Sequence, residues 1–200
     1  MRYPDSHKDE TRARVVKAAA AAVRARGPDG VGVAEIMKEV GLTHGGFYAH
    51  FPSKEALVAA AVEEAFEQGR RRFGRITDEL EGLEAFGAFV DTYVTMEHRA
   101  APERGCPLAT IASDLPRQGP AVRAVFDAGV AGLIGRIANW LPGDPAEREG
   151  QASSLVAEMA GAVSLSRAVS DDAMAARFLE QSRRRIRTRA GLNDDMAGTA

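Results

Sequence analysis

The chain has 200 residues, of which 45% are hydrophobic and 27% charged, and its formal net charge at pH 7 is −2. This length and composition fit one or two compact domains and exclude a chain too poor in apolar residues to fold. No run of about 18 apolar residues could span a membrane, and the N-terminal segment lacks a signal peptide's apolar core, so we expect a cytoplasmic protein.

The hydrophobic pattern predicts helices along the chain and no strands. The first helix is expected at about Lys8–Arg26, where small and apolar residues recur at three- and four-residue spacing before Gly27–Gly30 ends it. A short helix over Val33–Val40, a third over His44–Phe51 and a long one from Ser53 to about Phe73 follow. Proline-containing breaks separate the later expected helices, which are Leu83–Arg99, Pro107–Asp114, Pro120–Leu141, Pro145–Val169 and Asp171–Arg189.

Four arginines of the first helix lie off its apolar stripe: Arg12, Arg14, Arg24 and Arg26. Charged residues in such positions usually form a solvated face, and this is our interpretation of most of them. One or two near the start of the helix could contact phosphate.

The segment from Gly41 to Leu57 joins the end of one helix, a short aromatic helix and the start of a long helix. Gly41 suits the left-handed conformation that ends a helix, and the Thr43 hydroxyl is expected to cap the next one. Phe47 and Phe51 are four residues apart and are expected to face the core.

The same segment has residue types that suit DNA. Gly45 and Gly46 would let the backbone approach the floor of the major groove, although a frayed first turn would also explain this pair. Lys54 lies in the first turn of the following helix, where the helix dipole disfavours a positive charge and a nearby phosphate would explain it. Other side chains can hydrogen-bond to phosphates or base edges: Thr43, His44, Tyr48 and His50.

Residues Val31 to Leu57 closely resemble the N-terminal helix-turn-helix of the TetR/AcrR-like transcriptional regulators. The resemblance rests on Gly41-Leu42-Thr43, Gly46-Phe47-Tyr48-x-His50-Phe51 and Ser53-Lys54-Glu55-x-Leu57. It implies that DNA phosphates are contacted by Thr43, Tyr48, His50 and Lys54, and that His44 and Gly45 lie near base edges. Val33 stands where such proteins commonly have a Ser or Thr cap, so a looser start of the second helix is expected.

The resemblance implies an all-α protein with a three-helix DNA-binding head, residues 1–52, joined by a long helix to a C-terminal body. That body, residues 53–190, would bind a ligand and dimerise, and the polar tail 191–200 is expected to be disordered. The implied protein is a homodimeric repressor that binds palindromic double-stranded operator DNA. A small, largely apolar effector would release the repressor from its operator. We expect no cofactor, no metal site and no membrane partner.

Large apolar side chains of the middle helices could form an ordinary core or line the effector cavity. The candidate ligand-binding residues are Phe66, Phe89, Tyr93, Met96, Cys106, Ile111, Phe126 and Trp140. Residues of the last two long helices could complete the monomer's core or, as the resemblance implies, form a four-helix dimer interface. The candidates for this interface are Leu155, Met159, Val163 and Phe178.

Other classes of function fit the sequence less well. The four histidines show no metal-ligand spacing, and no glycine-rich phosphate loop follows a strand, so we do not expect an enzyme. Cys106 is the only cysteine, which excludes an intrachain disulfide. Cys106 lies at an expected helix start, where the helix dipole favours a thiolate. The alternative to a ligand-responsive repressor is therefore a helical small-molecule-binding or thiol-based sensor protein whose effector is an oxidant or electrophile. An inert buried thiol is the other interpretation.

Charge alone does not indicate a nucleic-acid partner. Residues 1–55 contain nine Lys and Arg against seven Asp and Glu, a net charge of +2, and the remainder carries −4. The sign of this asymmetry favours DNA binding by the N-terminal part, but its size is small. The prediction therefore rests on the motif.

Overall fold

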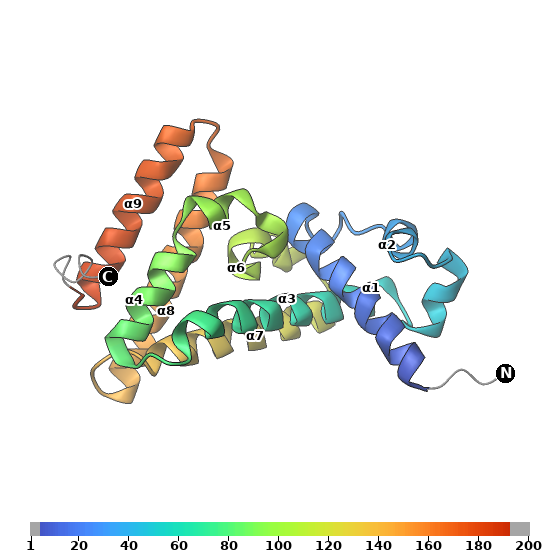
Figure 1. Cartoon of the computed structure of the whole chain (residues 1–200), viewed down its shortest axis with the longest axis horizontal. Coiled ribbons are helices and arrows are strands. Elements are labelled where there is room, and N and C mark those ends of the chain that lie inside the picture. Colours follow the sequence, from blue (N-terminus) through green and yellow to red (C-terminus); the bar gives the residue numbers. More distant parts are fainter. Residues whose placement is uncertain (1–4, 193–200) are drawn as a thin grey trace. The chain divides into compact units, whose positions relative to one another are not determined.

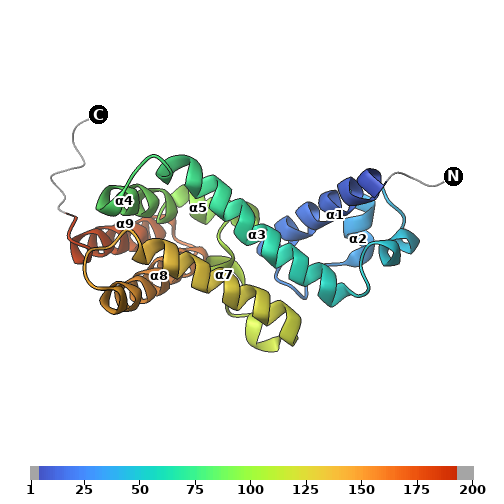
Figure 2. The ribbon, with the colours of Figure 1, turned by 90° about the horizontal axis from the view of Figure 1, so that it is seen from below.

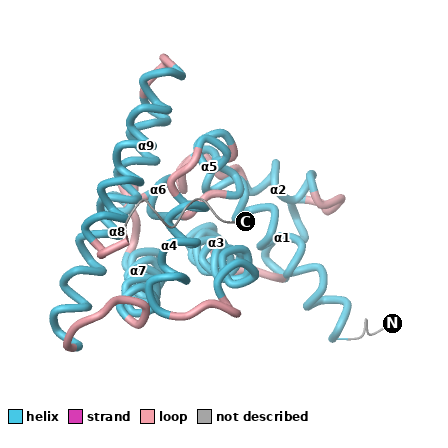
Figure 3. The backbone as a smooth tube through the Cα atoms, turned by 60° about the vertical axis from the view of Figure 1, so that its left-hand side comes forward, coloured by secondary structure: helices cyan, strands magenta, loops and turns pink. Residues whose placement is uncertain are grey.

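The computed structural model describes residues 5–192, which form helices and loops without a β-strand (Figures 1 and 3). The all-helical prediction is confirmed for this part of the chain. The helices are α1 (Asp5–Arg26), α2 (Val33–Glu39), η1 (His44–Ala49), α3 (Lys54–Thr77), α4 (Gly82–Tyr93), α5 (Met96–Ala100), η2 (Pro102–Arg104), α6 (Pro107–Ile111), η3 (Leu115–Arg117), α7 (Pro120–Ala138), α8 (Pro145–Ala168) and α9 (Asp172–Arg189), where η marks a 3-10 helix. Of the predicted tail, residues 193–200 lie outside the described part.

The chain divides into two compact units. The first unit contains the residues up to Gln68 together with Pro102–Gly129, and the second contains Gly69–Ala101 and the residues from Val130 onward. Helices α3 and α7 therefore each contribute residues to both units. The predicted boundary at residue 52 separates two functions, a DNA-binding head and a regulatory body, and it stays a prediction.

The first unit has one hydrophobic core that draws on distant parts of the sequence. Buried residues of α1, α2 and η1 pack together with those of the first half of α3. Ile111, Leu115 and Val122 belong to the same core, although they follow in the sequence only after α4 and α5. The segment that runs from α6 into α7 thus completes the hydrophobic core of the N-terminal helices.

Arg24 departs from the expectation of a solvated face, because its side chain is only 4% exposed. Its guanidinium donates to the Glu103 carbonyl at 2.8 Å, the Ala65 carbonyl at 3.3 Å and Gln68 Oε1 at 2.7 Å. Burial lowers the pKa of this guanidinium, and Cys106 is the foremost of the nearby groups that raise it. Arg24 therefore joins α1 to α3 and to η2, contacts that the pattern of α1 alone could not reveal.

The predicted helix Leu83–Arg99 is interrupted in the second unit. Helix α4 ends at Tyr93 and α5 begins at Met96, because the Thr95 hydroxyl accepts a hydrogen bond from the His98 N–H at 3.1 Å. A threonine that caps a new helix in this way competes with continuation of the previous one. The predicted helix Pro107–Asp114 is also shorter, since α6 ends at Ile111.

An aromatic cluster forms part of the core of the second unit. Ring centroids are separated by 4.7 Å for Phe73 and Phe89, 5.5 Å for Phe89 and Tyr93, and 5.7 Å for Phe89 and Trp140. His98 is buried beside Tyr93 and donates from Nδ1 to the Tyr93 carbonyl at 2.7 Å. Burial lowers the pKa of His98 to about 4, so the imidazole is neutral at pH 7.

Helices α8 and α9 pack side by side in the second unit (Figures 1 and 2). Arg99, near the end of α5, donates to the carbonyls of Ser166 at 2.7 Å and Val169 at 3.2 Å. Arg167 in turn donates to the Arg99 carbonyl at 3.2 Å. The ends of α5 and α8 are thereby held together by two arginines that satisfy carbonyl groups left open at helix C-termini.

Candidate nucleic-acid interface

The turn after α2 is the element that positions the next helix. Gly41 has a φ of 76°, a conformation that residues with a Cβ rarely adopt. The Leu42 N–H donates to the Met37 carbonyl at 2.8 Å, and the Gly41 N–H donates to the Lys38 carbonyl at 3.0 Å. These two bonds form a Schellman motif. The prediction that Gly41 ends the second helix is confirmed.

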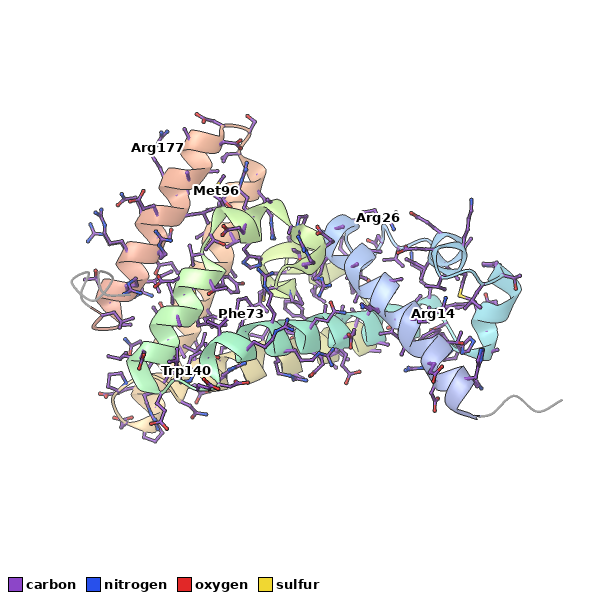
Figure 4. The ribbon with its side chains drawn as sticks, viewed as in Figure 1. Arg14, Arg26, Phe73, Met96, Trp140 and Arg177 are labelled. Atoms are coloured by element: carbon purple, nitrogen blue, oxygen red, sulfur yellow. The ribbon has the colours of Figure 1, made fainter. Side chains whose placement is uncertain are left out.

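The start of α2 differs from the expected arrangement, because Val33 is the first helical residue and not the cap. Gly32 is the N-cap residue, and no side chain donates or accepts a capping hydrogen bond there. The other end of α2 is tied to α1, because Arg14 Nη2 donates to the Val40 carbonyl at 2.5 Å; Figure 4 labels Arg14 on α1. The two helices are therefore joined just before the turn.

The third helix is shorter and tighter than the predicted His44–Phe51. It is a 3-10 helix over His44–Ala49, because two successive glycines are poor α-helix formers and Pro52 leaves little room for a second α-turn. Thr43 occupies the N-cap position, but its side chain makes no capping hydrogen bond, so the predicted cap is wrong. Its backbone carbonyl instead accepts from the Gly46 N–H at 3.1 Å.

The two faces of η1 separate core from surface as predicted. Phe47 and Phe51 are buried with ring centroids 5.7 Å apart, which confirms their assignment to the core. Tyr48 is 70% exposed on the other side. A Cβ added at Gly45 would meet no atom of the described residues within 4 Å, so packing within the chain does not require glycine there.

Five of the six predicted DNA-contacting residues are exposed and close in sequence: Thr43, His44, Gly45, Tyr48 and Lys54. His50 is half-buried, and its Nδ1 atom lies buried without a hydrogen-bond partner among the described residues. The structure thus leaves the polar side of η1 and the start of α3 accessible. Their contacts with DNA stay predictions.

Lys54 has a partner that the sequence did not indicate. Its ammonium donates to the Asp29 carbonyl at 3.2 Å, in the loop between α1 and α2. The charge in the first turn of α3 is therefore explained without a phosphate. The sequence interpretation also missed a contact of Arg12. Its guanidinium lies 5.0 Å from the centre of the Phe51 ring, a cation–π contact next to η1.

The predicted ligand-binding residues are divided between the two units. Phe66, Cys106, Ile111 and Phe126 belong to the first unit, and Phe89, Tyr93, Met96 and Trp140 to the second. Within the first unit, the ring centroids of Phe66 and Phe126 are 5.7 Å apart. The Phe66 ring also packs so closely on Gly129 that a Cβ added at Gly129 would overlap it. Within the second unit, Met96 is exposed at the start of α5, a position that does not suit the wall of an enclosed cavity (Figure 4).

Three of the four predicted dimer-interface residues face the chain's own interior. Leu155, Met159 and Val163 are buried within the single chain, which favours the monomer-core interpretation for them. Phe178 is 37% exposed and is accessible to a partner. Met174 on α9 and Leu165 on α8 are also exposed large apolar residues, and of these two the sequence interpretation did not single out Leu165.

Residues 5–192 contain neither of two further kinds of site. No group of three or more His, Cys, Asp or Glu side chains in this range could hold a metal ion. None of the helices in the same range combines the length and apolarity that a membrane crossing requires.

An exposed polar helix after a glycine turn, supported by a helical body, defines a helix-turn-helix protein of the all-α class. Residues 15–61 match the family described as "Bacterial regulatory proteins, tetR family". A TetR transcriptional regulator from Chloroflexus aurantiacus J-10-FL has a similar structure, with a TM-score of 0.76 and 28% identity over 92% of this chain and 95% of that one. The N-terminal part of the chain therefore matches the TetR family model, and the chain as a whole has the fold of a TetR regulator.

Other relatives agree with this assignment. The regulator LmrA of Bacillus subtilis is 36% identical over 43% of this chain and 46% of its own length, and UidR of Escherichia coli is 27% identical over 58% and 57%. The match thus spans about half the length of these curated relatives. The reduced form of E. coli NemR shares the fold, with a TM-score of 0.75 and 20% identity over 90% of this chain and 96% of that one.

Proposed function

We propose that the protein is a sequence-specific DNA-binding transcriptional regulator, a dimeric repressor released from its operator by a small, largely apolar effector. The observation that carries the proposal is the division of η1 into a buried aromatic side and an exposed polar side. Phe47 of η1 and Phe51, two residues after its end, are buried, so Tyr48 and its polar neighbours face outward. The relatives LmrA and UidR are HTH-type transcriptional regulators, which supports the same function.

The proposed contacts divide into two kinds. Thr43, Tyr48, His50 and Lys54 would hold phosphates and so fix the position of η1, and His44 with Gly45 would approach base edges. The small positive charge of the N-terminal part means that each protomer makes few ionic contacts. Two protomers on one operator would supply the remaining affinity.

The salt dependence of operator binding tests this function. We expect the protein to bind the DNA upstream of its own gene, with an affinity that falls as salt rises. Lys54→Ala removes one cation per protomer from the DNA backbone and should lower the slope of log K against log salt by about 0.9 for each phosphate left without its lysine. The measurement is a fluorescence anisotropy titration at several salt concentrations.

Arg185→Ala is the matched control for this experiment, because Arg185 is an exposed cation on α9 in the second unit. It should leave both the affinity and the slope unchanged. Equal binding to the upstream DNA and to a shuffled sequence would argue against a sequence-specific regulator. Binding of small molecules without any binding of DNA would favour a helical carrier protein.

A thiol-based sensor is the second candidate function, and the surroundings of Cys106 favour it. Cys106 is buried at the N-cap of α6 and raises the pKa of the Arg24 guanidinium. Arg24 joins α1 to α3 and η2, so an adduct on Cys106 would disturb a group that holds the first unit together. The structure of NemR, a protein of similar fold, is described as a reduced form.

Alkylation of Cys106 separates the two candidates. The sulfur of the thiolate adds to the carbon–carbon double bond of N-ethylmaleimide, and the neighbouring carbon takes a proton from water, so no oxidant is required. If Cys106 is a sensor, this reagent should weaken operator binding about tenfold or more, and Cys106→Ala should abolish the response. An identical response of the parent protein and Cys106→Ala would contradict the sensor, since the chain has no other cysteine.

A further inference from the structure

The loop between α1 and α2 connects a predicted DNA contact to a much later part of the chain. Lys54 Nζ donates to the Asp29 carbonyl at 3.2 Å, and Gln118 Nε2 donates to Asp29 Oδ1 at 3.1 Å. We infer that Gln118 is a positioning residue that sets the place of Lys54 through Asp29. This inference rests on the proposed DNA-binding function, and all three residues lie in the first unit.

The turn η3 holds the same loop at a second point. A Cβ added at Gly27 would lie 3.0 Å from Asp114 Oδ2, so the Asp114 carboxylate packs directly on the start of the loop. Arg117 Nη2 donates to Asp114 Oδ1 at 2.6 Å and steadies that carboxylate. Asp114 and Gln118 stand on either side of η3 and contact the loop at Gly27 and Asp29.

Leu115 fixes η3 itself. Its side chain is buried in the core that contains the buried residues of α1, α2 and η1. A turn anchored by a buried leucine is a firmer support than a surface hydrogen bond alone, because the apolar contact resists displacement. The position of Gln118 is therefore determined by the same core that determines η1.

The first turn of α3 meets the start of α7 next to this network. A Cβ added at Gly119 would overlap Glu55 Oε1, so the Glu55 carboxylate rests on the residue before α7. A carboxylate at a helix N-terminus is favoured by the helix dipole. Lys54 therefore contacts the residue that Gln118 also contacts, and the adjacent Glu55 packs on Gly119.

These contacts give Gln118 a role in DNA binding although it need not touch DNA. An ammonium group has three donors, so Lys54 can retain Asp29 and still bind a phosphate. When the loop shifts, the same ammonium follows the Asp29 carbonyl and loses its alignment with the phosphate. A displacement of η3 would therefore weaken the contact between Lys54 and the DNA phosphate.

An exchange of hydrogen-bonding roles tests the inference. Gln118→Glu places a second carboxylate beside Asp29 and replaces a hydrogen bond by repulsion, so operator affinity should fall about tenfold. The double variant Gln118→Glu with Asp29→Asn restores the bond, since the asparagine amide donates to the new carboxylate. Its affinity should return to within about threefold of the parent.

The salt slope shows whether the effect passes through Lys54. Gln118→Glu should lower the slope as Lys54→Ala does, by about 0.9 for each phosphate that Lys54 no longer neutralises, and should add nothing in a Lys54→Ala background. Urea titrations identify variants whose weaker binding comes from unfolding. A Gln118→Glu effect that persists in full without Lys54 would overturn the role of Gln118.

The parent protein separates this inference from the function on which it rests. If the parent binds its operator and Gln118→Glu binds equally well with the same salt slope, only the positioning role is overturned. If the parent shows no salt-dependent binding to the operator, the proposed function is overturned together with it. Restoration by Asp29→Asn, with a parent-like slope, is the expected result.

Discussion

Arg24→Ala is expected to lower the free energy of unfolding by about 3–5 kcal/mol, because it removes the donor for one buried and two part-buried acceptors at once. The guanidinium is the partner of the Glu103 carbonyl, the Ala65 carbonyl and Gln68 Oε1. Truncation to alanine also leaves a cavity between α1 and α3, which further lowers stability. Urea denaturation followed by circular dichroism measures the change.

Arg26→Ala is the matched control for Arg24→Ala. Arg26 lies two residues further along α1 and pairs with Glu35 at 2.6 Å, and both side chains are exposed. An exposed ion pair contributes about 0–1 kcal/mol, so Arg26→Ala should shift the urea midpoint only slightly. Equal shifts for the two variants would contradict a structural role for the buried guanidinium.

The comparison between Arg24 and Arg26 shows where sequence reasoning reaches its limit. Both arginines lie off the apolar stripe of α1, where the sequence predicts a solvated face for most of the arginines and does not distinguish these two. What buries Arg24 is α3 and the η2 turn, and its partner Glu103 in η2 lies 79 residues further along the chain. Periodicity within one helix describes its faces but carries no information about distant segments that cover them.

Local features were predicted more successfully. Gly41, Phe47 and Phe51 behave as the sequence indicates, because a positive φ, a helix end and a four-residue spacing are decided within one or two turns. The break at Thr95 was missed, since a threonine inside an apolar pattern can either continue a helix or cap a new one.

The candidate site was predicted in part. The exposure of Thr43, His44, Gly45 and Tyr48 agrees with a surface role, whereas the Lys54–Asp29 bond depends on a loop brought in from the other side of α2. On α8, the residues with the most regular apolar spacing, Leu155 and Met159, are in the core. Only apolar side chains that stay exposed once the chain's own core is packed can form an interface between copies.

A glutamate introduced at Leu165 together with one at Phe178 is expected to convert the proposed dimer into a monomer. Leu165 is 57% exposed and Phe178 37% exposed, and Met174 lies one helical turn before Phe178. Apolar side chains gathered on adjacent helices mark an interaction surface. On α8, small exposed or half-exposed residues repeat along the side of Leu165, namely Ala157, Gly161, Ser164 and Ala168, and small residues allow helices to approach closely.

Sedimentation velocity at micromolar concentration measures the change, and operator titration measures its consequence. A second DNA contact within a dimer is effectively intramolecular, so the monomeric variant should bind the operator about 10²–10³ times more weakly. Ile76→Glu is the matched control, because Ile76 is an exposed apolar residue of the second unit that lies on α3. It should retain both the dimer and the affinity.

The same pair of substitutions also tests the reason why a dimer is needed. If each protomer makes few ionic contacts, the monomeric variant should show about half the parent's salt slope, because it neutralises half as many phosphates. Surface substitutions away from the core change stability by only about 0.5 kcal/mol, so the monomer should remain folded. A folded monomer that kept the parent's affinity and slope would contradict the proposal that two copies of η1 read one operator.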